Sequence, residues 1–85
     1  MNSTWEPKRQ QIRDFLRRIR KNAGLTQLQL AERLDKPQSY VSKYELGERR
    51  LDFVETLEVC EACGEYNIDY LIRLVTKDRK GGAIK

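Results

Sequence analysis

The sequence predicts an all-α domain of five helices. Apolar residues recur at three- and four-residue intervals along most of the chain, which is the period of an amphipathic helix. Thr26 and Asp52 each precede such a segment with a Gln or Glu three residues later, the spacing of a helix-capping box. Glycines follow several of the segments, as expected where a helix ends in a left-handed residue.

A length of 85 residues allows one domain with a small core. We assign residues 7–76 to this domain and expect a flexible polar lead over 1–6 and a flexible charged tail over 77–85. Trp5 either packs on the first helix or stays mobile. No apolar run reaches the length of a membrane span and no signal peptide opens the chain, so we expect a cytoplasmic protein.

The first helix is expected over residues 7–23. Pro7 suits a first helical turn, and Gly24 suits the position after a C-terminus. Apolar side chains at i, i+3, i+4 and i+7 form one stripe: Ile12, Phe15, Leu16 and Ile19. We expect most basic residues of this helix to be solvated.

Two short helices are expected over 26–34 and 37–46. Asp35 tolerates the left-handed backbone of a tight turn between them, and Pro37 is expected at the first position of the second helix, where its missing N–H costs nothing. Two short helices joined in this way form a helix-turn-helix motif, here residues 26–46. Leu28, on the first of them, is either an ordinary exposed leucine or part of a contact surface.

The fourth helix is expected over residues 52–63 and the fifth after Asn67. The inner face of the fourth is assigned to Phe53, Val54, Leu57 and Cys60. The fifth helix is apolar on two edges. This is more apolar surface than so small a core can bury, and exposed apolar patches often mark interfaces. We therefore expect a homodimer interface made by Tyr70, Leu71, Leu74 and Val75.

The central motif contains a set of spaced residues: Leu25-Thr26-Gln27, Leu30-Ala31, Leu34, Gln38-Ser39, Val41-Ser42 and Tyr44-Glu45-Leu46-Gly47. These residues resemble the phage-repressor and Cro type of helix-turn-helix protein, also called the xenobiotic-response-element type. The resemblance covers roughly residues 12–75 and implies a lambda-repressor-like DNA-binding domain. Three positions depart from the family: Asp35 stands at the usual turn glycine, Pro37 at a usual Ser cap and Leu51 at a frequent proline.

The resemblance also implies two pairings. An arginine at the position of Arg20 pairs in this family with the glutamate at the position of Glu45, so we expect a partly buried ion pair. A glutamine that starts the second helix often holds the glutamine that starts the third. Here Gln27 would brace Gln38 and contact a phosphate.

Charge and side-chain chemistry favour DNA as the partner. Residues 1–50 carry a net charge of +6 and residues 51–85 a net charge of −2, which together give +4, so the motif lies in the basic half, as a phosphate footprint requires. Gln38 can bond adenine N7 and N6 bidentately, Ser39 a base or a phosphate, and Lys43 guanine or the backbone. The expected DNA-binding residues are Gln27, Gln38, Ser39, Tyr40 (thymine methyl or sugar), Ser42, Lys43, and Arg49 and Arg50 (phosphates).

An enzyme is not expected, and neither is a cofactor. The chain has no histidine, the usual general acid–base group, and its carboxylates are scattered. Cys60 and Cys63 supply two metal ligands where a structural zinc site needs four. Core packing is the expected role of both, with a redox or metal role as the alternative.

We therefore expect sequence-specific binding of duplex DNA by a homodimer that regulates transcription, as a repressor occluding a promoter. Two copies would read half-sites about one helical turn, ~34 Å, apart. Activation through a contact between RNA polymerase and an acidic patch on the fourth helix stays open. The rival interpretation, motivated by Leu28, Tyr70 and Leu74, is a protein-interaction module such as an antitoxin or a repressor antagonist, with DNA binding secondary.

Overall fold

A computed structural model describes residues 5–76 of the chain. The described residues form five helices and no strand, as the sequence predicted. Residues 1–4 of the expected lead and the whole expected tail lie outside the described range, while Trp5 and Glu6 belong to the first helix. The helices are α1 (Trp5–Asn22), α2 (Gln27–Leu34), α3 (Gln38–Leu46), α4 (Phe53–Ala62) and α5 (Asp69–Thr76).

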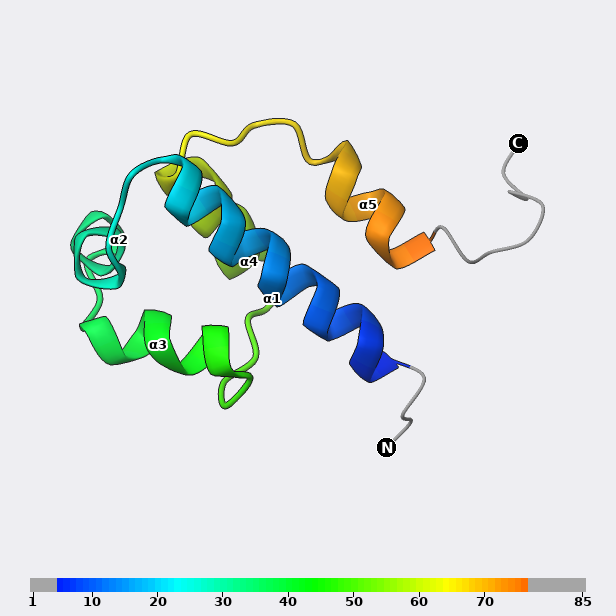
Figure 1. Ribbon diagram of the computed structural model, residues 1–85, viewed down its shortest axis with the longest axis horizontal. Coiled ribbons are helices and arrows are strands. Elements are labelled where there is room, and N and C mark those ends of the chain that lie inside the picture. Colours follow the sequence, from blue (N-terminus) through cyan, green and yellow to red (C-terminus); the bar gives the residue numbers. More distant parts are fainter. Residues whose placement is uncertain (1–4, 77–85) are drawn as a thin grey trace.

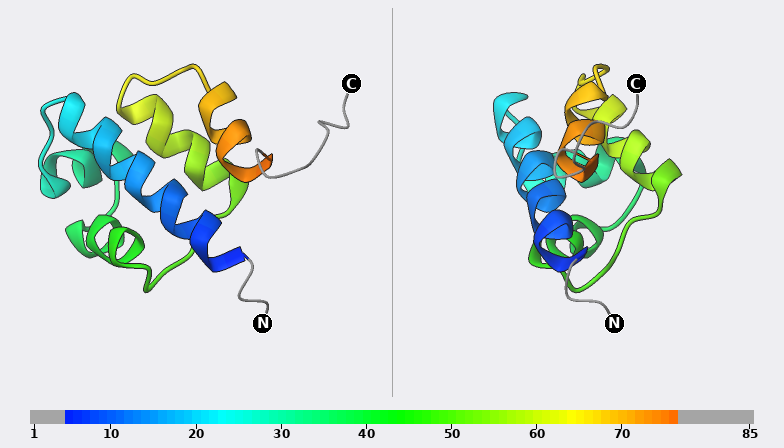
Figure 2. Two further views of the ribbon diagram at one scale, coloured as in Figure 1. Left: turned by 45° about the vertical axis from the view of Figure 1, so that its right-hand side comes forward. Right: turned by 90° about the vertical axis from the view of Figure 1, so that its right-hand side faces the viewer.

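The longest helix, α1, crosses the middle of the molecule and packs against α3, α4 and α5 (Figure 1). The short helices α2 and α3 lie together at the end of α1 where that helix finishes, and α2 also packs on α4. Helix α5 lies at the other end, beside the N-terminal half of α1, in every view (Figure 2). The helix-turn-helix pair is thus carried at one end of a scaffold made by the other three helices.

Local capping sets where the short helices begin and end. Thr26 and Asp52 both form complete capping boxes with the residues three positions on, as predicted. Asp35 adopts the left-handed conformation with φ 59° and ψ 45°. Pro37, however, is the N-cap of α3 with an extended backbone and no side-chain cap hydrogen bond, not the first helical residue. Proline is still tolerated at this position, because it has no backbone N–H and therefore leaves no donor without a partner.

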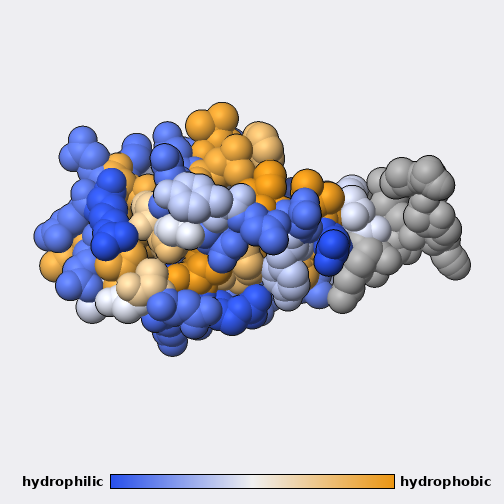
Figure 3. Space-filling view, turned by 90° about the horizontal axis from the view of Figure 1, so that it is seen from above, coloured by the Kyte–Doolittle hydropathy of each residue, from blue (hydrophilic) through white to orange (hydrophobic). Residues whose placement is uncertain are grey.

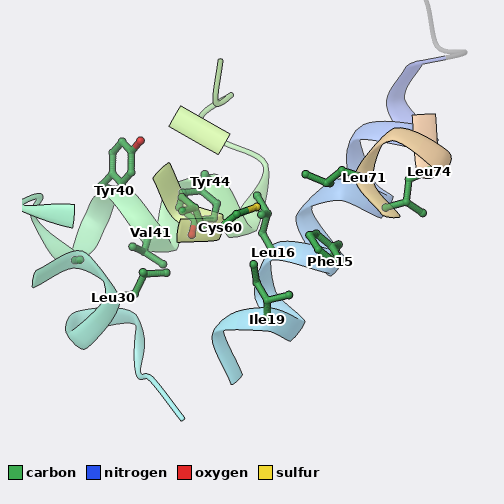
Figure 4. Close-up of a cluster of buried hydrophobic side chains, with 12 residues drawn as sticks. Phe15, Leu16, Ile19, Leu30, Tyr40, Val41, Tyr44, Cys60, Leu71 and Leu74 are labelled. Atoms are coloured by element: carbon green, nitrogen blue, oxygen red, sulfur yellow. The ribbon is translucent and has the colours of Figure 1, made fainter. Parts of the chain in front are cut away.

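The core draws side chains from all five helices (Figure 4). Leu16, Leu30, Val41, Tyr44 and Val59 are almost fully buried at its centre, and Tyr40 lies at the margin of the cluster. The remaining buried apolar members are Phe15, Ile19, Ala31, Cys60, Leu71 and Leu74. The face seen from above carries hydrophobic patches that hydrophilic residues surround and interrupt (Figure 3).

The buried face of helix α4 differs from the one expected. Val59 and Cys60 are buried and Leu57 is half-buried, whereas Phe53 and Val54 are 70% and 62% exposed. Phe53 lies two turns before Cys60 and so on a similar side of the helix. It belongs to the first turn, however, where the surrounding structure leaves its side chain in solvent.

Helix α5 also differs from the expected arrangement. Leu71 and Leu74 are only 9% and 8% exposed and belong to the core of the chain itself, so they have little surface left to face a second copy, and the interface expected on α5 stays a prediction. A helix of eight residues is marginal alone, and its one strongly apolar face is used against α1. Ile72 stays 52% exposed, and the ring of Tyr70 lies against Phe15 with centroids 5.2 Å apart.

Candidate nucleic-acid interface

Helix α3 presents a polar face to solvent and anchors itself from the opposite side. Val41, Tyr44 and Glu45 are buried against the scaffold. The outward face holds Gln38, Ser39 and Lys43, all exposed, and half-buried Ser42. Gln38 stands at the N-terminal end of the helix, the end that meets base edges when a recognition helix enters a major groove.

A buried ion pair fixes α3 to α1. Arg20 Nε donates to Glu45 Oε2 over 2.7 Å and Arg20 Nη2 donates to Glu45 Oε1 over 3.1 Å, the bidentate geometry that makes arginine–carboxylate pairs strong. The Glu45 side chain is 1% exposed. Burial raises its pKa, but hydrogen bonds from Arg20 and Gln27 outweigh burial and hold the pKa below its ordinary value. The carboxylate is therefore a fixed acceptor at neutral pH.

Gln27 connects this carboxylate to the exposed face of α3. Its Nε2 donates to Glu45 Oε1 over 2.9 Å, and its Oε1 accepts from Gln38 Nε2 over 3.4 Å. Because Glu45 can only accept, the amide nitrogen of Gln27 must face it and the oxygen must face Gln38. Gln38 then keeps its Oε1 and one N–H free, which are the acceptor and donor that an adenine edge requires.

Arg17 is a candidate DNA contact that sequence reasoning left among the solvated basic residues. Its Nε lies 3.5 Å from Glu45 Oε1, and its side chain is 47% exposed. It therefore brings a partly free positive charge beside Gln27, which hydrogen-bonds the same oxygen. The available signal was spacing, because Arg17 lies three residues before Arg20 and so on a neighbouring surface of α1.

The ring of Tyr40 is packed against the domain and not extended into solvent. It is only 8% exposed, and cations flank its ring: Lys36 Nζ lies 5.2 Å and Arg49 Cζ 4.6 Å from the centroid. The edge of the ring also meets Tyr44, with centroids 5.8 Å apart. The ring thus packs the start of α3 and has little exposed surface, and the expected thymine or sugar contact stays a prediction.

The two arginines after α3 are not equivalent. Arg49 donates to both carboxylate oxygens of Glu55 at 3.3 and 3.1 Å and also lies over Tyr40, so its guanidinium is engaged within the chain. Arg50 is exposed and forms no ion pair with any described residue. Arg50, not Arg49, is thus placed to meet a phosphate without first breaking a contact.

The cysteines lie in and next to the scaffold core. Cys60 is buried and Cys63 half-buried, both as free thiols. Burial raises the pKa of both, that of Cys63 to about 11, which disfavours the thiolate that redox chemistry and metal binding use. Within residues 5–76, no cluster of three or more His, Cys, Asp or Glu side chains could hold a metal ion.

These features define a class of protein, the helix-turn-helix domains that bind DNA. A family model described as helix-turn-helix matches residues 16–71, which is more than half of the chain. The chain belongs to this family, the phage-repressor and Cro type, whose members are DNA-binding transcription regulators and in general not enzymes. No curated protein sequence matches the chain. No helix within the described range is long and apolar enough to cross a membrane.

Proposed function

We propose that this chain binds a specific duplex DNA sequence as a homodimer and represses transcription by occupying a promoter. Helix α3 enters the major groove, where Gln38 reads a base and Ser39, Ser42 and Lys43 contact neighbouring bases or backbone. Gln27, Arg17 and Arg50 meet phosphates at the rim of the groove. The domain acts by binding alone, without a cofactor.

The observation that carries this proposal is the orientation of the Gln38 amide. An unrestrained exposed glutamine loses side-chain entropy on binding. Here Gln27 holds the amide from one side, and Glu45, buried and paired with Arg20, holds Gln27. Such preorganisation reduces the ordering cost of a base contact.

Substitution of Gln38 tests the base-reading role. Gln38→Ala should weaken binding to the selected site by ~1–3 kcal/mol and relax preference at one base pair, with little change on random duplex. Gln11→Ala is the matched control, because Gln11 is an exposed glutamine on α1 that is not among the residues assigned to DNA contact. The site is first selected from a random duplex pool, and affinities are then measured by fluorescence anisotropy. Equal losses on selected and random DNA would refute the role of Gln38.

Salt dependence separates DNA binding from the rival protein-interaction function. If the described arginines and lysines replace counterions, log affinity should fall with log salt with a slope of about −0.9 for each neutralised phosphate. Arg50→Gln should reduce that slope by about one phosphate, while Arg49→Gln should reduce it less because Arg49 is held by Glu55. Binding that is absent, or insensitive to salt, would favour the interaction module.

The homodimer requires an apolar surface that the fold does not already use. With Leu71 and Leu74 buried, the exposed candidates next to α3 are Leu46 at its end and Phe53 and Val54 at the start of α4, 66%, 70% and 62% exposed. A pair of domains joined there would hold both copies of α3 close to one side of a duplex. We assign the dimer contact to these three residues in place of the α5 residues.

An interface at the start of α4 and an interface on α5 would be broken by different substitutions. Phe53→Glu should shift sedimentation toward the monomer and weaken operator binding, because a charge would be buried in the contact. Tyr70→Glu, a comparable change on 44% exposed Tyr70 of α5, should leave the dimer intact. The reverse pattern would return the interface to α5.

A further inference from the structure

A pocket of about 240 Å³ opens between α1, the start of α4, α5 and the loop that follows α3. Its walls are mainly apolar and include Ile12, Leu16, Leu51, Leu71 and Val75. The volume equals that of about eight waters and falls below the ~300–1,000 Å³ of sites for drug-sized ligands. An occupant must therefore be small and largely apolar.

Positive charge borders this apolar space. Arg9, Arg13, Arg49 and Arg50 all line the pocket, and none of the carboxylate residues in the described part of the chain does. Glu6 is paired with Arg13 and Glu55 with Arg49. Arg9 and Arg50 form no ion pair within 4.0 Å among residues 5–76, although both lie near enough to Glu6 to help lower the pKa of its carboxyl. The pocket consequently favours a negative group at its margin.

Arg13 supplies a second, independent sign of a missing acceptor. Its Nη2 donates to Glu6 and to Gln10, but its Nε is buried without a hydrogen-bond partner in the described structure. The guanidinium is held close to the turn after α3, where a Cβ added to Gly47 would lie 3.1 Å from Arg13 Cζ. A buried donor left unpaired costs about 1–3 kcal/mol. Because Arg13 Nε has almost no exposed surface, an anion in the pocket would remove that cost only after the guanidinium turns toward it.

We propose that this pocket binds a small apolar monocarboxylate, of the size of a medium-chain fatty acid or an arylalkanoic acid. The hydrocarbon part occupies the space between Leu16, Leu51 and Leu71. The carboxylate accepts from Arg13 and is attracted by Arg9 and Arg50. A carboxylate suits arginine better than a neutral polar group does, because charge-assisted hydrogen bonds are roughly twice as strong.

Occupation of the pocket would oppose DNA binding. The pocket is bounded by Tyr44 of α3 and by the loop that carries Arg50, so the bound carboxylate would neutralise a charge that we assign to a DNA phosphate. This second part rests on the proposed function, whereas binding of the carboxylate does not. The ligand is then a negative effector of the domain.

Direct titration without DNA tests the site itself. Octanoate and 3-phenylpropanoate are titrated by calorimetry into the full chain, with octanol and acetate as probes of the apolar and charged parts alone. We expect octanoate to bind at least about tenfold more tightly than octanol, the factor that one charge-assisted hydrogen bond supplies, and acetate not to bind detectably. Equal affinities of octanoate and octanol would overturn the role of the arginines.

Variants of the pocket then locate the ligand. Val75→Phe fills the apolar space and Arg13→Gln removes the buried donor, and each should reduce octanoate affinity about tenfold or more. Arg73→Gln is the control, because Arg73 is exposed on α5 and does not line the pocket. Thermal unfolding checks that each variant is folded, and binding by a folded Val75→Phe protein at unchanged affinity would overturn the site.

Two further measurements distinguish the ligand site from the effector role. Octanoate affinity that falls as the protein concentration rises into the dimeric range would assign the pocket to a side chain of the second copy and overturn the proposal. Octanoate should also weaken operator binding by the wild-type chain but not by the Val75→Phe chain. If calorimetry shows binding and operator affinity is unchanged, the pocket stands and the effector role fails. If no DNA binds under any condition, only the proposed function fails.

Discussion

Gln27 donates from Nε2 to the buried carboxylate of Glu45 over 2.9 Å, so its carbonyl oxygen is turned toward Gln38. This hydrogen bond connects the stability of the domain to its surface chemistry. The carboxylate is held by Arg20 inside the fold, and the amide at the start of α3 is the last member of the same chain of contacts. A change in the interior should therefore alter how DNA is read, even where α3 itself is unchanged.

The ion pair of Arg20 and Glu45 provides the first prediction. Glu45→Leu leaves a buried guanidinium unpaired and should lower the free energy of unfolding by ~3–5 kcal/mol. The double variant Arg20→Met/Glu45→Leu removes both charges and should recover most of that loss, since an apolar pair often replaces a buried ion pair at little cost. Urea denaturation monitored by circular dichroism measures both.

The recovered double variant separates folding from DNA reading. It keeps Gln38 but removes the acceptor that orients Gln27, so its preference for the selected site over random duplex should fall by ~1–3 kcal/mol, as in Gln38→Ala. A double variant that is stable and fully selective would show that the buried pair has no part in positioning Gln38. A double variant as unstable as Glu45→Leu would show that Arg20 contributes mainly through its bond to the Leu25 carbonyl.

The second prediction concerns the stability of the fold at acidic pH. Because burial is outweighed by the hydrogen bonds from Arg20 and Gln27, the pKa of Glu45 lies below its ordinary 4.5 in the folded chain. The unfolded chain thus takes up the proton first, and the stabilisation, complete above pH 4.5, is lost as the pH falls through the folded pKa. The double variant should lose less stability than the wild type between about pH 6 and pH 3, measured by urea denaturation. Parallel losses would contradict this.

Local rules were sufficient for the elements of this fold. The two capping boxes and the left-handed turn at Asp35 depend on residues three or four positions apart, and each is present as expected. The Arg20–Glu45 contact spans 25 residues, and the resemblance to a family supplied it. Spacing alone does not give pairings at that separation.

The role of a residue is harder to predict from sequence where one residue type serves two purposes. An aromatic residue on a recognition helix can contact a base or pack, and Tyr40 packs because Lys36 and Arg49 flank its ring. The apolar period of α5 was visible, but whether Leu71 and Leu74 face α1 or a second copy depends on how α5 docks. Arg49 was expected at a phosphate, and its partner Glu55 belongs to the next helix.

The third prediction uses the buried hydroxyl of Tyr44. The residue is 1% exposed, and its phenolic oxygen has no hydrogen-bond partner in the described structure. Tyr44→Phe keeps the ring and removes an unsatisfied polar group, so it should stabilise the fold by about 1 kcal/mol. Tyr40→Phe, at the margin of the core, is the control and should change stability less. Loss of stability in Tyr44→Phe would mean that a buried water satisfies the hydroxyl.

The fourth prediction concerns the turn between α2 and α3. Asp35 has φ 59° and ψ 45°, and its backbone N–H bonds the carbonyls of Ala31 and Glu32. A left-handed backbone costs an L-residue roughly 1–2 kcal/mol, and glycine avoids this cost. Glycine also gives the unfolded chain more conformational freedom, which lowers the stability of the fold by about 0.4–1 kcal/mol.

The net effect of Asp35→Gly should therefore be a small gain, up to about 1 kcal/mol. Asp35→Val is the opposing variant, because a β-branched side chain is a genuine outlier at positive φ. It should lose about 1 kcal/mol, the difference between the ~3 kcal/mol upper cost of a strained residue and the roughly 1–2 kcal/mol that Asp35 already carries. Both are measured by thermal unfolding at neutral pH, with selected-site binding as a check on α3. If both variants lose stability equally, the Asp35 side chain stabilises the turn, and relief of backbone strain cannot be the dominant effect.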